Sequence, residues 1–318
     1  MAARRVIVAL AMGLQGWLRP GDSYFRGMAR SPRTFVPLAC GCAAAFLVLL
    51  VLAYASHGAR NLDATALSGF LDLQRPAVET AIESIAALGN PAQVGLMAVA
   101  LAVLALARGR PRIALAIIVL LGATSISSQV LKTVLAYPRF DGLVNGAHVD
   151  PAAFPSGHAT AAMSIALAGV LAAPSRARPL AALLGSALAL GVGFSVIALG
   201  WHFPSDVVGG FLLASAWTLV IASALQAASE RFPERSGRTR ATRALRAAVD
   251  GAATLGLVAL TIALLLLVAM AGVLVLTSRP DDLVEFAGDH TSVVAVGLAI
   301  ALAATALLAG VTAALRHG

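Results

Sequence analysis

Two histidine-containing segments of this 318-residue chain have the residue types that nucleophilic and acid–base chemistry need. In the first, His202 is followed four residues later by Asp206, and Pro204 between them suits the first position of a helix. A carboxylate in that first turn could hold one ring nitrogen as N–H and leave a lone pair on the other, which prepares a histidine as a nucleophile or base. Alternatively, Asp206 could only be an acid that favours the start of a helix.

The second segment, 155–158, reads Pro-Ser-Gly-His and precedes an apolar stretch. Proline and a small residue predict a helix start there, and glycine lets a ligand approach the backbone closely. The first N–H groups of a helix lack internal partners and bind anions. The segment therefore predicts that Ser156 and Gly157 cradle a phosphate with His158 beside it, and a plain N-terminal turn is the alternative.

The only lysine of the chain, Lys132, stands seven residues before Arg139 at the end of an apolar stretch. Because the other 22 basic residues are all arginine, a lysine at this position is unusual. A lysine that only extends its charged end toward the membrane surface is the alternative. Phosphoryl transfer without a metal would be suited by this set of groups, which contains two cations, two histidines, a carboxylate and a helix start.

No metal and no other cofactor is predicted. His148 and Asp150 lie near His158 in the sequence, but two residues in an outer loop define no coordination geometry. Cys40 and Cys42 are two positions apart in an apolar stretch, so they would face different sides of a helix and form neither a disulfide nor a metal pair.

Membrane-spanning helices must position these residues. The chain is 59% hydrophobic and 12% charged with a mean hydropathy of +0.87, which excludes a water-soluble domain, a disordered chain and a disulfide scaffold. Crossing a bilayer takes about 20 apolar residues. Eight stretches qualify or nearly qualify: 34–56, 86–107, 113–134, 157–173, 180–201, 205–226, 251–277 and 291–315.

The distribution of charge predicts the orientation. With a cytoplasmic N-terminus, 18 of the 23 Lys and Arg residues fall on the inner side and 11 of the 15 acids on the outer side. Lys132, His158 and His202 then all meet the outer face of a cell membrane. The arginines are divided among five inner segments, so the net charge of +8 does not indicate nucleic-acid binding. The arginine- and alanine-rich composition suggests a bacterial source.

The same pattern predicts four regions. Residues 1–33 form a cytoplasmic N-terminal segment with a short interfacial helix, and 34–228 form a six-helix core. Residues 229–248 are a basic cytoplasmic linker, and 249–318 are a C-terminal transmembrane hairpin whose role the sequence leaves open.

At these residues the sequence resembles the type 2 phosphatidic acid phosphatase family, whose pattern is K-x6-R-P, P-S-G-H and S-R-x5-H-x3-D. The matching residues are Lys132 and Arg139, then Pro155 to His158, then Ser195, His202 and Asp206. The resemblance implies an all-α integral membrane protein with a six-helix core. It implies a lipid phosphate substrate, here an isoprenyl (di)phosphate or a phospholipid phosphate monoester, hydrolysed at the outer face.

The resemblance also implies a role for each residue. His202 would attack phosphorus to form a phosphohistidine while Asp206 orients it. His158 would protonate the leaving oxygen and later help to activate water. The phosphate oxygens would be held by Lys132, Arg139, Ser156 and Gly157.

Two positions depart from the family pattern. Phe140 replaces a proline, and Val196 replaces an arginine. Loss of one preorganised donor typically costs about 3 kcal/mol of transition-state stabilisation. The alternatives are a slower enzyme, a compensating cation (Arg60, Arg75 or Arg279), or a protein that binds a phosphorylated lipid without turnover. A phosphotransferase of the same fold, with an acceptor other than water, is a further alternative.

Overall fold

The structure, a computed structural model, describes residues 35–72, 76–140, 144–232, 247–252, 254, 256, 288 and 290–317. Within these residues, regular structure is helical apart from one isolated bridge between Val144 and Ala147. The helices are α2 (Phe35–Ala55), α3 (His57–Leu71), α4 (Pro76–Ala86), the 3-10 helix η2 (Ala87–Gly89), α5 (Pro91–Ala107), α6 (Pro111–Val134), α7 (Gly157–Ala172), α8 (Arg178–Ala198), α9 (Pro204–Arg231) and α12 (Thr291–His317).

Several of these helices are long and apolar enough to span a membrane. They are α2, α6, α8, α9 and α12, and the bent α4–α5 pair adds a sixth if it is counted as one span. The predicted all-α membrane fold is therefore confirmed. The segment 1–33 and most of the predicted crossing 251–277 and of the linker 229–248 lie outside the described residues, so the division into four regions stays a prediction.

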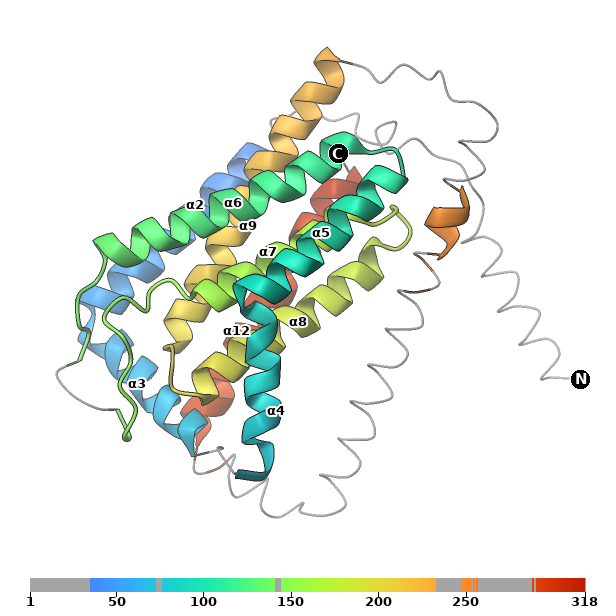
Figure 1. Cartoon of the computed structure of the whole chain (residues 1–318). Coiled ribbons are helices and arrows are strands. Elements are labelled where there is room, and N and C mark those ends of the chain that lie inside the picture. Colours follow the sequence, from blue (N-terminus) through green and yellow to red (C-terminus); the bar gives the residue numbers. More distant parts are fainter. Residues whose placement is uncertain are drawn as a thin grey trace, which may run out of the picture.

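Helix α7 is the centre of the bundle. It packs against α6, α8 and α9, and most of its residues are buried (Figure 1). Close helix contact depends on small residues, as is usual in membrane bundles. A Cβ at Gly185 of α8 would lie 2.8 Å from Ala166 Cβ of α7, and one at Gly210 of α9 would lie 2.8 Å from Thr160 Oγ1. These glycines let α8 and α9 approach α7, which carries the 155–158 motif at its start.

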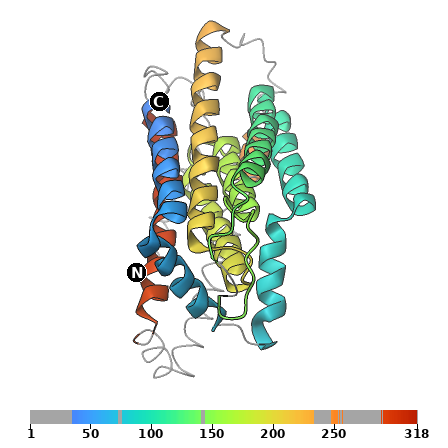
Figure 2. The same cartoon turned by 90° about the vertical axis from the view of Figure 1, so that its left-hand side faces the viewer.

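The predicted crossing 86–107 is not a single straight helix. The chain bends by 54° between α5 and the segment formed by α4 and η2. Helix α4 packs against α8 and lies at the lower end of the view in Figure 2. Asn90 has extended backbone angles (φ −70°, ψ 151°) because a residue before proline, here Pro91, is disfavoured in a helix. The break therefore places Gly89 and Asn90 inside the bundle, beside α7.

Helix α3 was not predicted. Ser56 begins it as an N-cap, its hydroxyl accepting from the Ala59 N–H at 3.3 Å. Its buried residues, Asp63, Ala66, Leu67, Gly69 and Phe70, recur at the spacing of one helix face. The helix is short and amphipathic, so an apolar-length criterion misses it. Its buried face packs against α2, α8, α9 and α12.

The C-terminal helix α12 packs on the core, against α8, α9 and α3. The Arg178 guanidinium at the start of α8 donates to the Leu315 carbonyl at 2.7 Å. At the other end of α12, Val293 fills the space beside Gly69 of α3. The last predicted crossing is thus part of the same bundle, where it stands roughly parallel to α2 and α9 (Figure 2).

Candidate active site

The three predicted segments meet at one end of the helix bundle. Lys132 lies in the last turn of α6, α7 begins at Gly157, and the turn between α8 and α9 carries His202. The ring centroids of His158 and His202 are 6.4 Å apart. The structure therefore brings together residues that are far apart in the sequence.

The Lys132 side chain lies beside the start of α7. A Cβ at Gly157 would be 3.7 Å from Lys132 Nζ. The lysine charge also interacts with the carboxylates of Asp206 and Asp150. An ammonium next to a helix start favours the binding of an anion. The role of Lys132 as a phosphate ligand stays a prediction.

The buried His202 side chain is positioned by the sharp turn that joins α8 to α9. Gly200 in this turn has a φ of +74°, a left-handed conformation that favours glycine. The Trp201 N–H closes the turn by donating to the Val196 carbonyl at 3.0 Å. A Cβ at Gly200 would also lie 2.9 Å from Ala147 Cβ, so the turn needs glycine for space as well.

The Asp206 carboxylate, fully buried in the first turn of α9, faces both the histidine and the backbone. Its Oδ2 lies 3.5 Å from His202 Nδ1 and accepts a hydrogen bond from the Phe203 N–H at 2.9 Å. The contact with the ring is longer than an ordinary hydrogen bond of about 3 Å, and such contacts often tighten when substrate binds. Asp206 therefore caps the helix start, and its predicted role in orienting His202 stays a prediction.

Ser156 joins the starts of α7 and α9. Its N–H donates to the Asp206 carbonyl at 2.9 Å, and its hydroxyl accepts from the Ala159 N–H at 3.3 Å as the N-cap of α7. The Ser156 N–H therefore has a protein partner, which a phosphate would have to replace. Its predicted phosphate contact, like that of Gly157, is not tested by this arrangement.

The Arg139 guanidinium is buried and points at protein groups. Nη2 lies 2.6 Å from Asp206 Oδ1, and Nη1 donates to Ser205 Oγ at 2.9 Å. The guanidinium carbon also lies 4.4 Å from the centroid of the Phe203 ring. In this arrangement Arg139 holds Asp206 in place, and its predicted contact with a phosphate stays a prediction.

Asp63 on α3 is a second buried carboxylate at this site, and the sequence analysis missed it. It accepts hydrogen bonds from both the N–H and the hydroxyl of Ser205, and its Oδ2 lies 3.5 Å from Arg139 Nη1. Burial raises the pKa of Asp63 from 3.8 to about 6. The Ser205 hydrogen bonds and the Arg139 charge oppose this rise only in part. In the sequence, the only feature that points to a buried Asp63 is its position on the apolar face of the helix 57–71.

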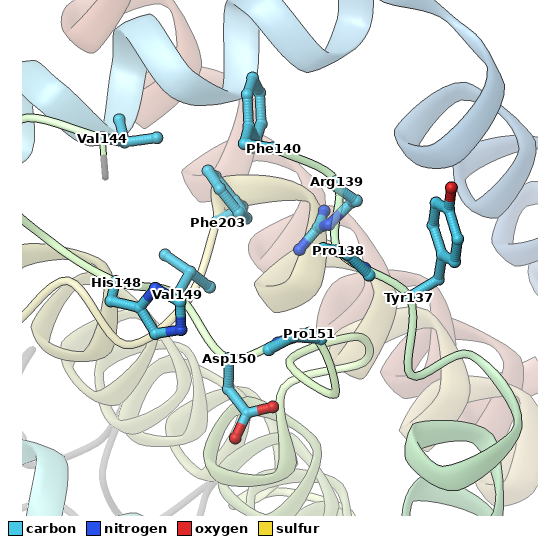
Figure 3. A pocket seen from close by; sticks show the side chains of 10 residues that line it. All are labelled: Tyr137, Pro138, Arg139, Phe140, Val144, His148, Val149, Asp150, Pro151 and Phe203. Carbon is cyan, nitrogen blue, oxygen red and sulfur yellow. The ribbon is translucent and has the colours of Figure 1, made fainter. Parts of the chain in front are cut away.

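A pocket opens beside Arg139, lined by residues of the loop 137–151 and of the turn before α9 (Figure 3). His148 and Asp150 lie across this pocket from Arg139 (Figure 3). Asp150 Oδ1 accepts from the Ala152 N–H at 2.7 Å, so this carboxylate shapes its own loop. Among the residues that the structure describes, no group of three or more His, Cys, Asp or Glu could hold a metal ion.

Comparison with known proteins finds one family model that matches part of the chain. Residues 113–230 match the model of the PAP2 superfamily, and they contain every predicted site residue. Residues 113–230 therefore resemble the PAP2 superfamily. A similar solved structure is a transmembrane PAP2-type phosphatidylglycerolphosphate phosphatase from Bacillus subtilis, with 22% identity, a TM-score of 0.51, and coverage of 63% of this chain and 98% of that chain. This likeness shows the fold. Comparison with curated proteins gave no match.

Val196, within the region that matches the PAP2 superfamily model, is fully buried in α8. It belongs to the apolar core that α8 forms with α7 and α9, one turn before the His202 turn. An apolar side chain therefore occupies the position at which the family pattern predicts a cation.

Arg60 is the one described residue among the three candidate compensating cations, since Arg75 and Arg279 fall outside the described ranges. It donates to the Arg139 carbonyl at 3.3 Å and lies 2.9 Å from His57 Nδ1. These contacts engage Arg60 with the backbone of Arg139 and with His57, and its role as a compensating cation stays a prediction.

Proposed function

We propose that this protein belongs to the PAP2 superfamily and is a metal-independent lipid phosphatase that forms a phosphohistidine intermediate on His202. The observation that carries the proposal is the placement of His202, with Asp206 Oδ2 3.5 Å from its Nδ1 and the His158 ring 6.4 Å away. A carboxylate at Nδ1 leaves Nε2 as the nucleophile.

The reaction proceeds in two steps. In the first, a bond forms between His202 Nε2 and phosphorus, the bond to the lipid oxygen breaks, and His158 gives that oxygen a proton. In the second, His158 takes a proton from water, the water oxygen attacks phosphorus, and the bond to His202 breaks. Lys132 offsets the charge on the equatorial oxygens, which is the main electrostatic requirement of phosphoryl transfer.

The substrate is an isoprenyl (di)phosphate or a phospholipid phosphate monoester. Two features support a lipid: the site lies at one end of a bundle of apolar helices, and the similar solved structure is that of a phospholipid phosphate phosphatase. The apolar part of the substrate stays in the bilayer while its phosphate enters the site. The distribution of the arginines supports an outer-face location.

The test is phosphate release by the purified full chain in detergent with EDTA. Short-chain phosphatidic acid and isoprenyl phosphates and diphosphates are the substrates. His202→Ala should abolish both release and vanadate sensitivity, whereas His57→Ala, which removes an exposed histidine of α3, should leave both unchanged. Robust activity in His202→Ala would overturn the mechanism.

A second candidate function is binding of a lipid phosphate without turnover. It is favoured by the buried Val196 and by Arg139, whose guanidinium is engaged with Asp206 and Ser205. Saturable binding of phosphatidic acid to the parent protein, with no phosphate release from any of the substrates named above, would support binding without turnover.

A further inference from the structure

The His158 side chain receives a polar contact from the break between α4 and α5. Its Nε2 lies 2.9 Å from Asn90 Oδ1, and the contact joins residues 68 positions apart. The ring is half-buried, with its centroid 5.6 Å from that of Trp201. A histidine proposed to exchange protons with substrate and water thus has one ring nitrogen held by a side-chain amide.

Asn90 occupies the N-cap position of α5 without capping the helix through its side chain. Asparagine is favoured at N-caps because its side-chain oxygen accepts from the N–H groups of the first turn. Asn90 has the extended backbone typical of an N-cap, yet it makes no side-chain capping bond. Its amide is directed to His158 instead. The ordinary structural reason for an asparagine here is therefore absent.

Gly89 provides the space for this contact. A Cβ at Gly89 would lie 3.0 Å from both Cβ and Cδ2 of His158 and 3.1 Å from its Cα. Since the third of these atoms is backbone, any side chain at position 89 would push the break and α7 apart. The glycine and the 54° bend together bring the Asn90 amide to the level of the imidazole.

We infer that Asn90 is a positioning residue that fixes the orientation and the proton placement of His158, and that Gly89 permits the contact. The inference rests on the function proposed above. An amide oxygen only accepts hydrogen bonds, so the contact requires the hydrogen on Nε2. Nδ1 is then the nitrogen that gives a proton to the leaving oxygen and takes one from water. Asp206 has the corresponding position at the proposed nucleophile, since its Oδ2 is 3.5 Å from His202 Nδ1 and leaves Nε2 for phosphorus.

The leaving group provides a test that separates positioning from general damage. A general acid matters for an alkyl leaving oxygen and little for a nitrophenolate, which departs without a proton. Because kcat/KM reports only the steps up to cleavage of the lipid ester, Asn90→Ala should lower it on the order of 10- to 100-fold for dioctanoyl phosphatidic acid. For 4-nitrophenyl phosphate the fall should be less than about threefold. Gly89→Ala should show the same selectivity.

Matched controls lie on the same helix. Gln93→Ala removes an exposed amide one turn further along α5, and Gly95→Ala adds a methyl where no atom lies within 4 Å. Both should leave kcat/KM unchanged for both substrates. Asn90→Asp keeps an oxygen acceptor, so it should restore kcat/KM for dioctanoyl phosphatidic acid. Because its negative charge favours a protonated His158, the alkaline limb of the pH profile of kcat/KM should move to higher pH. Equal losses on both substrates in Asn90→Ala would overturn the inference.

A second readout does not depend on activity. Nitrogen-15 NMR of the histidine-labelled full chain in detergent, with the His158 signals assigned by their loss in His158→Gln, should show Nε2–H in the parent. Asn90→Ala should give a mixture of tautomers. An Nδ1–H ring in the parent would overturn the inference. If no substrate is hydrolysed, the proposed function fails, while the tautomer still decides whether Asn90 sets the proton on His158.

Discussion

Arg139 Nη2 lies 2.6 Å from Asp206 Oδ1, and both side chains are buried. The same carboxylate faces His202 through its other oxygen, at 3.5 Å. Arg139 is therefore linked to the proposed nucleophile through one carboxylate, with Ser205 and Asp63 completing the set of contacts. In this arrangement Arg139, which the sequence assigns to a phosphate, contacts the carboxylate that we propose orients the nucleophile.

Arg139→Ala should lower both stability and activity, because it leaves Asp206 buried without its cation. Breaking a buried ion pair in this way typically costs about 3–5 kcal/mol. Arg139→Lys should give an intermediate effect, since a lysine keeps the charge and lacks the planar group that reaches both Asp206 and Ser205. Thermal unfolding in detergent and phosphate release measure the two effects, and Arg231→Ala, at the exposed end of α9, is the control. Parental stability with strongly reduced activity would show that Arg139 acts on the phosphate alone.

Asp63 should make the stability of the protein depend on pH. Its pKa is about 6 in the folded protein and 3.8 in the unfolded chain, so folding favours its protonated form. The stabilisation is fully present below about pH 4 and is lost as the pH rises through about 6, with a total on the order of 3 kcal/mol. The unfolding temperature of the parent relative to Asp63→Asn should therefore fall between about pH 4 and pH 7.

The control for this measurement is Asp72→Asn, which removes an exposed carboxylate just after α3. It separates the effect of burial from that of a lost charge. A difference between parent and Asp63→Asn that stays constant over this pH range would contradict the raised pKa of Asp63.

The sequence predicts the convergence of the site but not its internal pairing. Lys132, His158 and His202 could be assigned to one face by counting crossings, because each crossing reverses the side of the membrane. The contacts of Asp63 with Ser205 and of Asn90 with His158 could not, since these residues are 142 and 68 positions apart. Such pairs depend on how short elements fold against the bundle. Helix α3 carries no long apolar run, and the break before Pro91 interrupts the apolar stretch 86–107, which the sequence predicts as one crossing.

Val196→Arg should increase phosphate release. The family pattern has a cation at this position, and one additional preorganised donor to the transition state is worth on the order of 10²- to 10³-fold in rate. The matched control is Val192→Arg, one turn earlier in α8 and equally buried, which carries the same burial cost farther from His202. Phosphate release and vanadate inhibition measure the gain. Unchanged lipid-phosphate binding and no turnover in Val196→Arg would instead favour a protein that binds without catalysis.

Lys132→Gln should weaken vanadate binding and lower kcat/KM on the order of 10²-fold, because it removes a cation from the phosphate site. Lys132→Arg should retain part of the activity, since it keeps the charge with a different reach. Gln129→Ala, an exposed position one turn earlier on α6, is the control. Parental vanadate affinity in Lys132→Gln would mean that this lysine only extends toward the membrane surface.

Gly200→Ala should destabilise the protein and reduce activity together, because this glycine sets the direction of His202 two residues later. An alanine at φ +74° costs roughly 1–3 kcal/mol in backbone strain, and its Cβ would meet Ala147 Cβ at 2.9 Å.

Gly200→Asn separates the two causes, since asparagine tolerates the left-handed region but keeps the Cβ contact. If strain dominates, Asn should recover most of the stability; if the contact dominates, Asn and Ala should be equally impaired. Gly122→Ala, where no atom lies within 4 Å, is the control, and thermal unfolding with phosphate release gives both readouts. A Gly200→Ala variant with parental activity would show that the turn does not direct the nucleophile.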